Sequence, residues 1–283
     1  MSTTYEDVLY EVQDRIAVIR LNRPEALNAF TVAMGNGLRN SIGAAVADPE
    51  VRVIVLTGSG RGFCAGADMK LLQGIQGDGS ATGPRPGEAD VGAPDSSSDL
   101  GPDVSTHYGG RFGYMLKAKK PIIAALNGPA AGLGFVLALY ADVRFAGSEA
   151  VFTTSFAQRG LIAEHGCSWL LPRLVGPAHA LDLLLSARKF GAAEAERMGL
   201  VNKVVPQSAL MDEVMAYARA LADTVSPRSM AVMKAQVWKS PFQDFGTALA
   251  VADSEMLASF RSEDFREGVA HYMEKRPPRF KGL

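Results

Sequence analysis

Two glycine-rich turns, each directly after an apolar strand, are the segments of this 283-residue chain best suited to chemistry. The first, GSGRGFCAGAD at 58–68, follows VIVLT, and the second, NGPAAGLGF at 127–135, follows PIIAAL. Small residues let a ligand approach the backbone closely, and each turn offers backbone N–H groups where a helix is expected to begin. Two such donors directed at one oxygen would form an oxyanion hole. The alternative is that both segments are simply tight strand-to-helix turns.

Other kinds of site are not favoured by the residue spacing. A dinucleotide-binding fingerprint needs a third small residue, and Phe63 and Leu137 occupy those places. The histidines do not fall at ligand spacing, so no structural metal is expected; they are His107, His165, His179 and His271. Cys64 and Cys167 are too few for a disulfide framework and are predicted to be small buried residues.

The segment RGFCAGADMK at 61–70, together with PIIAALNGPAAGLGF at 121–135, resembles the crotonase (enoyl-CoA hydratase/isomerase) superfamily. Three other segments carry the same resemblance: LNRPEALNAF near the start, FGAAEAERMGLVNKVVP, and EKRPPRFKG at the end. The resemblance covers nearly the whole chain except residues 73 to about 110. It implies an α/β fold, a crotonase-like spiral of ββα repeats with a helical C-terminal trimerisation region. A homotrimer or a dimer of trimers follows from it.

By this resemblance the substrate is an acyl-CoA, whose thioester oxygen the N–H groups of Ala67 and Leu133 would hold. Family members usually have Gly at the second position, but the backbone is the donor, so the leucine side chain would only shape the acyl pocket. The remaining predicted substrate-binding residues near the turns are Arg23, Ala26, Ala65, Asp68 and Lys70. Phe280 and Lys281 are expected to reach the nucleotide of a neighbouring subunit. Coenzyme A is part of the substrate, and no other cofactor is implied. For the cations Arg23, Lys70 and Lys281, the alternative is a solvated position on the surface.

The position of the acid distinguishes reactions within this superfamily. Hydratases carry two glutamates, at the places where this chain has Val136 and Phe156, and both side chains are instead predicted to line the acyl pocket. The segment FTTSFAQRGLIAEHGCSWLLPR resembles enoyl-CoA isomerases and the ring-epoxide or oxepin isomerases of phenylacetate breakdown, which have a lone acid where Glu164 stands. The residues next to Glu164 are apolar, which favours a raised pKa of its carboxyl and a role as proton shuttle. The alternative is that Glu164 caps a helix.

The predicted function is therefore an acyl-CoA enzyme that moves a double bond, with Glu164 carrying one proton between Cγ and Cα of the substrate. Three alternatives stay open: hydration by the same glutamate, acyl-CoA binding without catalysis, and thioester hydrolysis. His165 could assist Glu164, although neighbouring residues on a helix point apart. Three more residues are candidates for substrate contact by their location alone: His107, Tyr108 and Arg111.

The elements that would position these residues alternate between strand and helix patterns, which is typical of a layered α/β core. Strands are expected within 8–24 (two, with a turn near QDR), 51–60, 121–128, 143–147 and 150–155. Helices are expected over 31–48 with Thr31 as N-cap, from 67 with Asp68 as N-cap, and over 108–120 and 131–142. From 177 onward the pattern is nearly all helical.

The chain is predicted to have a core at 1–200 carrying the acyl-CoA site and a helical region at 201–283. Residues 73–110 interrupt the core with a segment rich in Gly, Pro, Ser and Asp, which predicts a mobile surface loop. A formal net charge of −1 argues against nucleic acid as a partner. The uncharged stretch 121–141 contains Pro121, Asn127 and Pro129, so a buried strand, turn and helix are favoured over a membrane span. The N-terminal segment lacks a signal-peptide pattern, so a cytoplasmic location is expected.

Overall fold

The computed structural model describes residues 2–69, 73 and 107–282 of the chain. Its strands are β1 (Ser2–Tyr5), β2 (Val8–Gln13), β3 (Ile16–Leu21), β4 (Val53–Gly58), β5 (Ile122–Leu126), β6 (Ala130–Ala131), β7 (Val143–Gly147), β8 (Val151–Thr153), β9 (Phe190–Gly191) and β10 (Lys203–Val205). Its helices are α1 (Val32–Ala47), α4 (Gly113–Lys117), α5 (Leu133–Leu139), α6 (Cys167–Ser186), α7 (Ala192–Arg197), α8 (Leu210–Thr224), α9 (Pro227–Lys239), α10 (Phe245–Phe260) and α11 (Glu263–Glu274). The short 3-10 helices are η1 (Pro24–Ala26), η2 (Ala157–Arg159), η3 (Gln207–Ala209) and η4 (Ser240–Phe242).

The main sheet has seven strands in the order β1-β2-β3-β4-β5-β7-β10. The first three pair antiparallel, and β3, β4, β5, β7 and β10 pair parallel. Since parallel neighbours need crossover connections, helices lie between them in the chain, with α1 between β3 and β4 and α5 between β5 and β7. The carboxyl ends of the adjacent strands β4 and β5 therefore deliver the two glycine-rich turns side by side.

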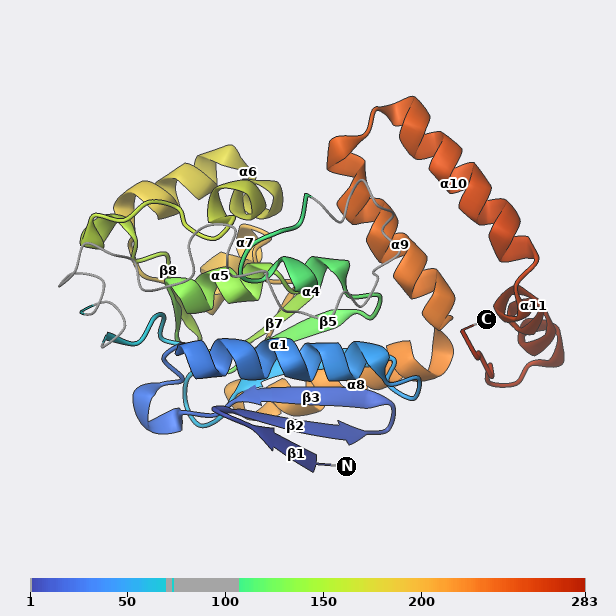
Figure 1. The fold of residues 1–283 in the computed structure, drawn as a ribbon, viewed down its shortest axis with the longest axis horizontal. Coiled ribbons are helices and arrows are strands. Elements are labelled where there is room, and N and C mark those ends of the chain that lie inside the picture. Colours follow the sequence, from blue (N-terminus) through green and yellow to red (C-terminus); the bar gives the residue numbers. More distant parts are fainter. Residues whose placement is uncertain (1, 70–72, 74–106, 283) are drawn as a thin grey trace.

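Both faces of the parallel part of the sheet are buried, as Figure 1 indicates by the helices on either side. Along β4, Ile54 and Leu56 belong to the larger core beneath α1, α4, α5 and α6. Val53 and Val55 point the other way and join the smaller core formed with α8. This alternation follows from the two-residue period of a strand and explains why β4 is apolar at nearly every position.

A small second sheet extends the site region. Its order is β6-β8-β9, and β6 pairs parallel with β8 through the partners Ala130–Phe152 and Ala131–Thr153. Because β6 belongs to the second glycine-rich turn, the chain leaving β8 begins next to that turn. This chain is the segment that leads through η2 to Glu164 and α6.

Helices α9, α10 and α11 extend away from the sheet, with α10 lying alongside α9 (Figure 1). The first of them is attached to the core at Asp142, which accepts hydrogen bonds from Lys234 Nζ at 2.7 Å and from Trp238 Nε1 at 3.3 Å. In contrast, α10 has no buried residue in this single chain. Its apolar side chains are exposed, among them Phe245, Leu249, Met256, Leu257 and Phe260.

Most of the predicted elements are confirmed. The two strands with a turn after Gln13 are present, and the Thr31 side chain accepts a hydrogen bond from Met34 N as the predicted N-cap of α1. The helix expected over 108–120 is only Gly113–Lys117, since Gly110 has a φ of +79°. The nearly all-helical expectation after 177 is confirmed for most of that region, except for the short strands β9 and β10, which pair with β8 and β7.

The division at residue 200 stays a prediction, and two elements beyond it join the core. β10 extends the main sheet, and α8 covers its second face, so the helices that project from the core begin with α9. The predicted mobile loop at 73–110 and the helix after Asp68 fall largely outside the described residues. Within the described ranges, no helix combines the length and the apolar character that crossing a membrane requires.

Candidate active site

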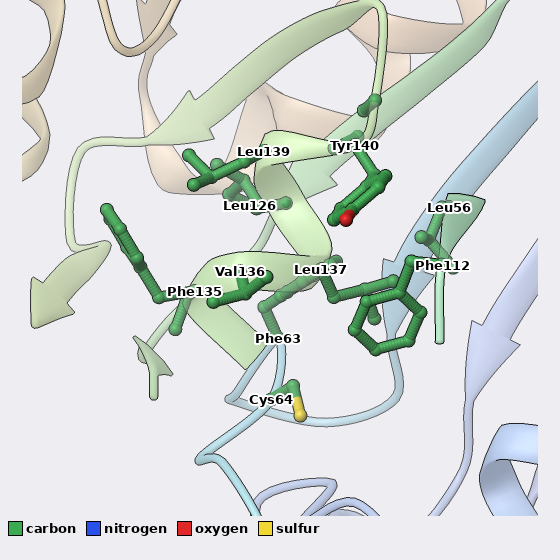
Figure 2. Close-up of a cluster of buried hydrophobic side chains, with 14 of the residues drawn as sticks. Leu56, Phe63, Cys64, Phe112, Leu126, Phe135, Val136, Leu137, Leu139 and Tyr140 are labelled. Atoms are coloured by element: carbon green, nitrogen blue, oxygen red, sulfur yellow. The ribbon is translucent and has the colours of Figure 1, made fainter. Parts of the chain in front are cut away.

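The two glycine-rich turns contact each other through backbone hydrogen bonds. Cys64 N donates to Pro129 O at 3.0 Å, and Ala131 N donates to Cys64 O at 3.0 Å. A side chain at Gly134 could not fit, since its Cβ would lie 2.2 Å from Cys64 O. Figure 2 shows the same junction from the side-chain view, with Phe63 and Cys64 of the first turn beside the start of α5.

The amide of Ala67 lies at the edge of this junction. Phe30 N donates to Gly66 O at 2.7 Å, and Asp68 N donates to Phe30 O at 3.0 Å. In such a parallel bridge the N–H of the intervening residue, Ala67, points away from Phe30. Among the hydrogen bonds of the described residues, none uses this N–H as donor. Ala67 therefore presents a free amide to the side of the turn opposite Phe30.

Leu133 provides a second amide nearby. It is the first residue of α5, so its N–H has no partner within the helix. The preceding Gly132 has a φ of +50° and donates its own N–H to Thr153 O at 3.1 Å. A Cβ placed on Gly66 would lie 3.9 Å from Leu133 N, so the first turn reaches the start of α5. The fold thus brings the two predicted donors to one junction, and the described hydrogen bonds leave both without an acceptor.

Glu164 is held by a tight turn directly before α6. Cys167 N donates to Glu164 O at 2.9 Å, and the two residues between them, His165 and Gly166, have φ values of +50° and +77°. The Tyr140 hydroxyl donates to His165 O at 2.9 Å. Gly166 is required here, because a Cβ would lie 2.7 Å from that hydroxyl oxygen.

The helix-capping interpretation of Glu164 is wrong, because the N-cap of α6 is Gly166 and no side chain caps the helix. The Glu164 side chain is 34% exposed. Burial raises the pKa of this carboxyl above its usual value, and the positive charge of Arg111 opposes the shift. A carboxyl with a raised pKa that still ionises near neutrality can both remove and return a proton.

His165 does not act as a charged partner of Glu164. Burial, followed by the charge of Arg111, lowers the pKa of its imidazole to about 4, so the ring is neutral at pH 7. Its Nε2 lies 3.8 Å from Glu164 Oε2, which is beyond hydrogen-bond distance. Glu164 therefore stands as the ionisable group of this turn.

The predicted CoA-binding residues at the first turn lie together. Arg23 Nη1 donates to Asp68 Oδ2 at 2.9 Å and to Ala29 O at 2.7 Å. The Arg23 side chain is 23% exposed, so it is a partly buried, paired cation and not a solvated one. Ala65 N donates to Leu27 O at 3.0 Å, which brings Ala65 beside the η1 segment that contains Ala26. Lys70 lies outside the described residues.

Four other predicted residues have different surroundings. Val136 lies on α5 and is 0% exposed. Phe156 lies directly before η2 and is 5% exposed, so both side chains are buried. Phe280 and Lys281 follow α11, close to the C-terminal end of the chain. There the Phe280 carbonyl accepts a hydrogen bond from Arg52, and the Lys281 amide donates to Asp264 at 3.0 Å. Within one chain these two residues are not brought to the turns.

A model of the enoyl-CoA hydratase/isomerase family matches residues 11–85 and 104–283. The chain belongs to this family. A probable enoyl-CoA hydratase of Rhodobacter capsulatus is 38% identical over 282 residues, or 99% of each chain. The 1,2-epoxyphenylacetyl-CoA isomerase of Escherichia coli is 34% identical over 277 residues, or 98% of this chain and 99% of the relative. The crystal structure of an enoyl-CoA hydratase/isomerase from Cupriavidus metallidurans has a TM-score of 0.82 at 29% identity, covering 99% of this chain and 98% of that one.

These matches confirm the predicted crotonase fold and an acyl-CoA enzyme of crotonase type. They also extend the resemblance. The sequence motifs predicted that it excludes residues 73 to about 110, whereas the family model leaves only residues 86–103 unmatched between its two parts. The relatives include proteins named as hydratases and one named as an isomerase. Family membership therefore leaves the choice of reaction to the residues of the site.

Asn28 is a supporting residue of the candidate site that sequence reasoning missed. It is fully buried, accepts from Arg23 N at 2.8 Å, and donates to Ser59 O at 2.9 Å and Gly62 O at 2.8 Å. These bonds fasten the segment carrying Ala26 to the first turn. An asparagine two residues before an aromatic in LNRPEALNAF was a visible signal, but the two carbonyls to which it donates are more than thirty residues away.

A second region of the molecule is concave but lies apart from the turns. A cavity of about 600 Å³ lies between the end of α1, α4, α9 and the C-terminal residues, and its lining contains several cations but neither Ala67, Leu133 nor Glu164. At least four of these cations have structural partners: Lys120 Nζ donates to the carbonyls of Ala45 and Asp48, Lys234 pairs with Asp142, Arg52 donates to the carbonyls of Ala222 and Phe280, and Arg228 pairs with Glu255. Among the described residues, no group of histidine, cysteine and acidic side chains is arranged to hold a metal ion.

Proposed function

We propose that this protein is an isomerase that shifts the double bond of an enoyl-CoA through an enolate intermediate. The observation that carries the proposal is the partly exposed carboxyl of Glu164, which lies on a turn tied through Tyr140 to the helix that bears the Leu133 amide. Where hydratases of the family carry glutamates by the sequence resemblance, this chain has the buried apolar side chains of Val136 and Phe156. One base and two amides suffice for a proton shift.

In the proposed reaction of a 3-enoyl-CoA, the N–H groups of Ala67 and Leu133 bind the thioester oxygen. Glu164 removes a proton from C2, and negative charge develops on that oxygen, where the two amides stabilise it. The same carboxyl then returns the proton to C4, which leaves the double bond between C2 and C3. No water is consumed, and no cofactor other than the coenzyme A of the substrate takes part in this scheme.

Enoyl-CoA hydration by Glu164 is the second candidate, and the 38% identical relative named as a probable enoyl-CoA hydratase favours it. The 34% identical isomerase of an epoxidised acyl-CoA supports the first candidate. Thioester hydrolysis and acyl-CoA binding without turnover are the other outcomes that an assay must separate.

The deciding assay supplies 3-enoyl-CoA and 2-enoyl-CoA separately, follows the absorbance of the conjugated thioester and identifies products by mass. Isomerase activity produces conjugation from the 3-enoyl substrate without a change in mass. Loss of conjugation from the 2-enoyl substrate with the mass of one added water would indicate hydratase activity instead, and release of free thiol would indicate hydrolysis. Glu164→Gln should remove most turnover while acyl-CoA still binds, and the exposed Glu149→Gln serves as its matched control.

We further propose that the chain assembles as a homotrimer or a dimer of trimers in the cytoplasm. The exposed apolar side chains of α10 support an interface, because such a surface is rarely left in water. In the assembly Phe280 and Lys281 would approach the nucleotide part of an acyl-CoA bound to a neighbouring subunit. Analytical ultracentrifugation tests the assembly, and a monomer at micromolar concentration would contradict it.

A further inference from the structure

Arg111 lies between the two parts of the proposed site. Its Cζ is 5.9 Å from the centroid of the Phe30 ring, and the backbone of Phe30 is the strand partner of the Ala67 turn. The Arg111 charge also acts on two groups of the Glu164 turn: it opposes the burial that raises the pKa of Glu164, and it adds to the burial that lowers the pKa of His165. The guanidinium therefore lies beside the ring of the residue that is bridged to Ala67, and its charge acts on the proposed base.

The guanidinium of Arg111 has an unused hydrogen-bond donor. Its Nε is buried and has no hydrogen-bond partner. Within the described part of the chain, no carboxylate lies within ion-pair distance of Arg111. Other arginines with little exposure are satisfied: Arg144 donates to the carbonyls of Ala141 and Leu200 at 2.6 and 2.7 Å. A buried donor without an acceptor is costly, so an acceptor supplied by a ligand would be bound favourably here.

The surroundings of Arg111 restrict the kind of acceptor. The Phe112 ring packs edge-on against the Phe30 ring, and the Cζ of Arg39 lies 4.7 Å from the centroid of the Tyr114 ring. The charges that act on Arg111 come from Glu164 and Arg39, with Tyr114 neutral because burial raises the pKa of its phenol. A ligand carboxylate would place a second negative charge near Glu164 and oppose its ionisation. A neutral oxygen would accept the hydrogen bond without this cost.

We propose that Arg111 determines substrate specificity by donating a hydrogen bond from Nε to a neutral oxygen on the acyl group. The substrate class is then an oxygenated enoyl-CoA whose acyl group bears a carbonyl, hydroxyl or ether oxygen, in preference to a plain alkenoyl-CoA. This inference rests on the proposed function, because it places the acyl group between the two amides and Glu164.

Binding of saturated acyl-CoA analogues tests the proposal without turnover. Isothermal titration of the full-length protein compares hexanoyl-CoA with 4-oxohexanoyl-CoA, 5-oxohexanoyl-CoA and adipoyl-CoA. The wild type should bind at least one oxo analogue about tenfold more tightly than hexanoyl-CoA. Arg111→Met should lose this preference and keep its affinity for hexanoyl-CoA within about twofold. The exposed Arg219→Met is the matched control and should retain the preference.

Several results would overturn the proposal. Equal affinity of the wild type for hexanoyl-CoA and both oxo analogues would do so even if the Arg111 variant failed to fold. Equal weakening of all ligands in a folded Arg111→Met variant would assign the residue a structural role, and tightest binding of adipoyl-CoA would assign it to a carboxylate. An oxo preference in a protein that isomerises no enoyl-CoA would uphold this inference and reject only the proposed function.

Discussion

The Tyr140 hydroxyl and the His165 carbonyl form a 2.9 Å hydrogen bond that joins the end of α5 to the turn carrying Glu164. Since α5 begins at Leu133, this bond connects the proposed oxyanion donor and the proposed base through one short helix. Tyr140 is itself buried, with Phe112 packed edge-on against its ring, and Figure 2 shows it among the apolar side chains around α5. The two halves of the site are thus held relative to each other by a buried polar contact.

Replacing Tyr140 by Phe should reduce activity through the position of Glu164. Without the tyrosine hydroxyl, the His165 carbonyl loses its hydrogen-bond donor. His165 has a φ in the left-handed region, which is unfavourable for a residue other than glycine, so the turn is then free to move. We expect kcat for the isomerisation to fall about tenfold, corresponding to about 1.4 kcal/mol, while KM changes little. Steady-state kinetics measure both, and the exposed Tyr272→Phe is the control. An unchanged kcat would show that this bond does not position the base.

The pH dependence of the reaction should report Glu164. The carboxyl acts as a base only when ionised, and burial raises its pKa. The acid limb of kcat/KM should therefore have an apparent pKa above the ordinary glutamate value of about 4.3. Arg111→Gln removes the charge that favours the carboxylate, so the limb should move to higher pH. Because the pKa of His165 is lowered to about 4, His165→Gln should leave the limb unmoved. A limb that follows His165 would exclude Glu164 as the titrating group.

The parts of the fold that could be predicted from the sequence are those determined by neighbouring residues. The strand at 53–58 is a continuous apolar run before glycine, and Thr31 caps a helix within its own first turn. β9 and β10 could not be recognised, because they have two and three residues and depend on pairing with β8 and β7 far away in the chain.

The same distinction applies to the candidate site. The resemblance placed Ala67, Leu133 and Glu164 by motif, and the structure brings the two amides to one junction. The environment of Glu164 could not be predicted, since Tyr140 and Arg111 are distant in sequence and approach it only in the fold. Arg111 was considered only for its place after the segment 73–110. Its unpaired Nε is a property of three-dimensional packing.

Contact between the two glycine-rich turns should tolerate no side chain at Gly134. A Cβ there would lie 2.2 Å from Cys64 O and 2.6 Å from Cys64 Cβ, so the turns would have to separate. We expect Gly134→Ala to destabilise the protein by about 1–3 kcal/mol or more, measured by denaturant unfolding. Gly43→Ala is the control: it lies inside α1 with no atom within 4 Å of the added Cβ, and it should stabilise the protein by about 0.5–1 kcal/mol. Equal effects of the two substitutions would contradict the proposed contact.

The ion pair between Lys234 and Asp142 should stabilise the attachment of α9 to the core. Its side chains are only 7% and 17% exposed, and Lys234 Nζ also donates to the carbonyls of Met115 in α4 and of Lys120 just after that helix. Lys234→Met leaves Asp142 partly buried without its cation, so we expect a loss of about 3–5 kcal/mol in the free energy of unfolding. Lys203→Met breaks the exposed pair with Glu213 and should cost no more than about 1 kcal/mol. If both variants unfold at the same denaturant concentration, the Lys234 pair contributes no more than a surface contact, and α9 is held by its aromatic neighbours alone.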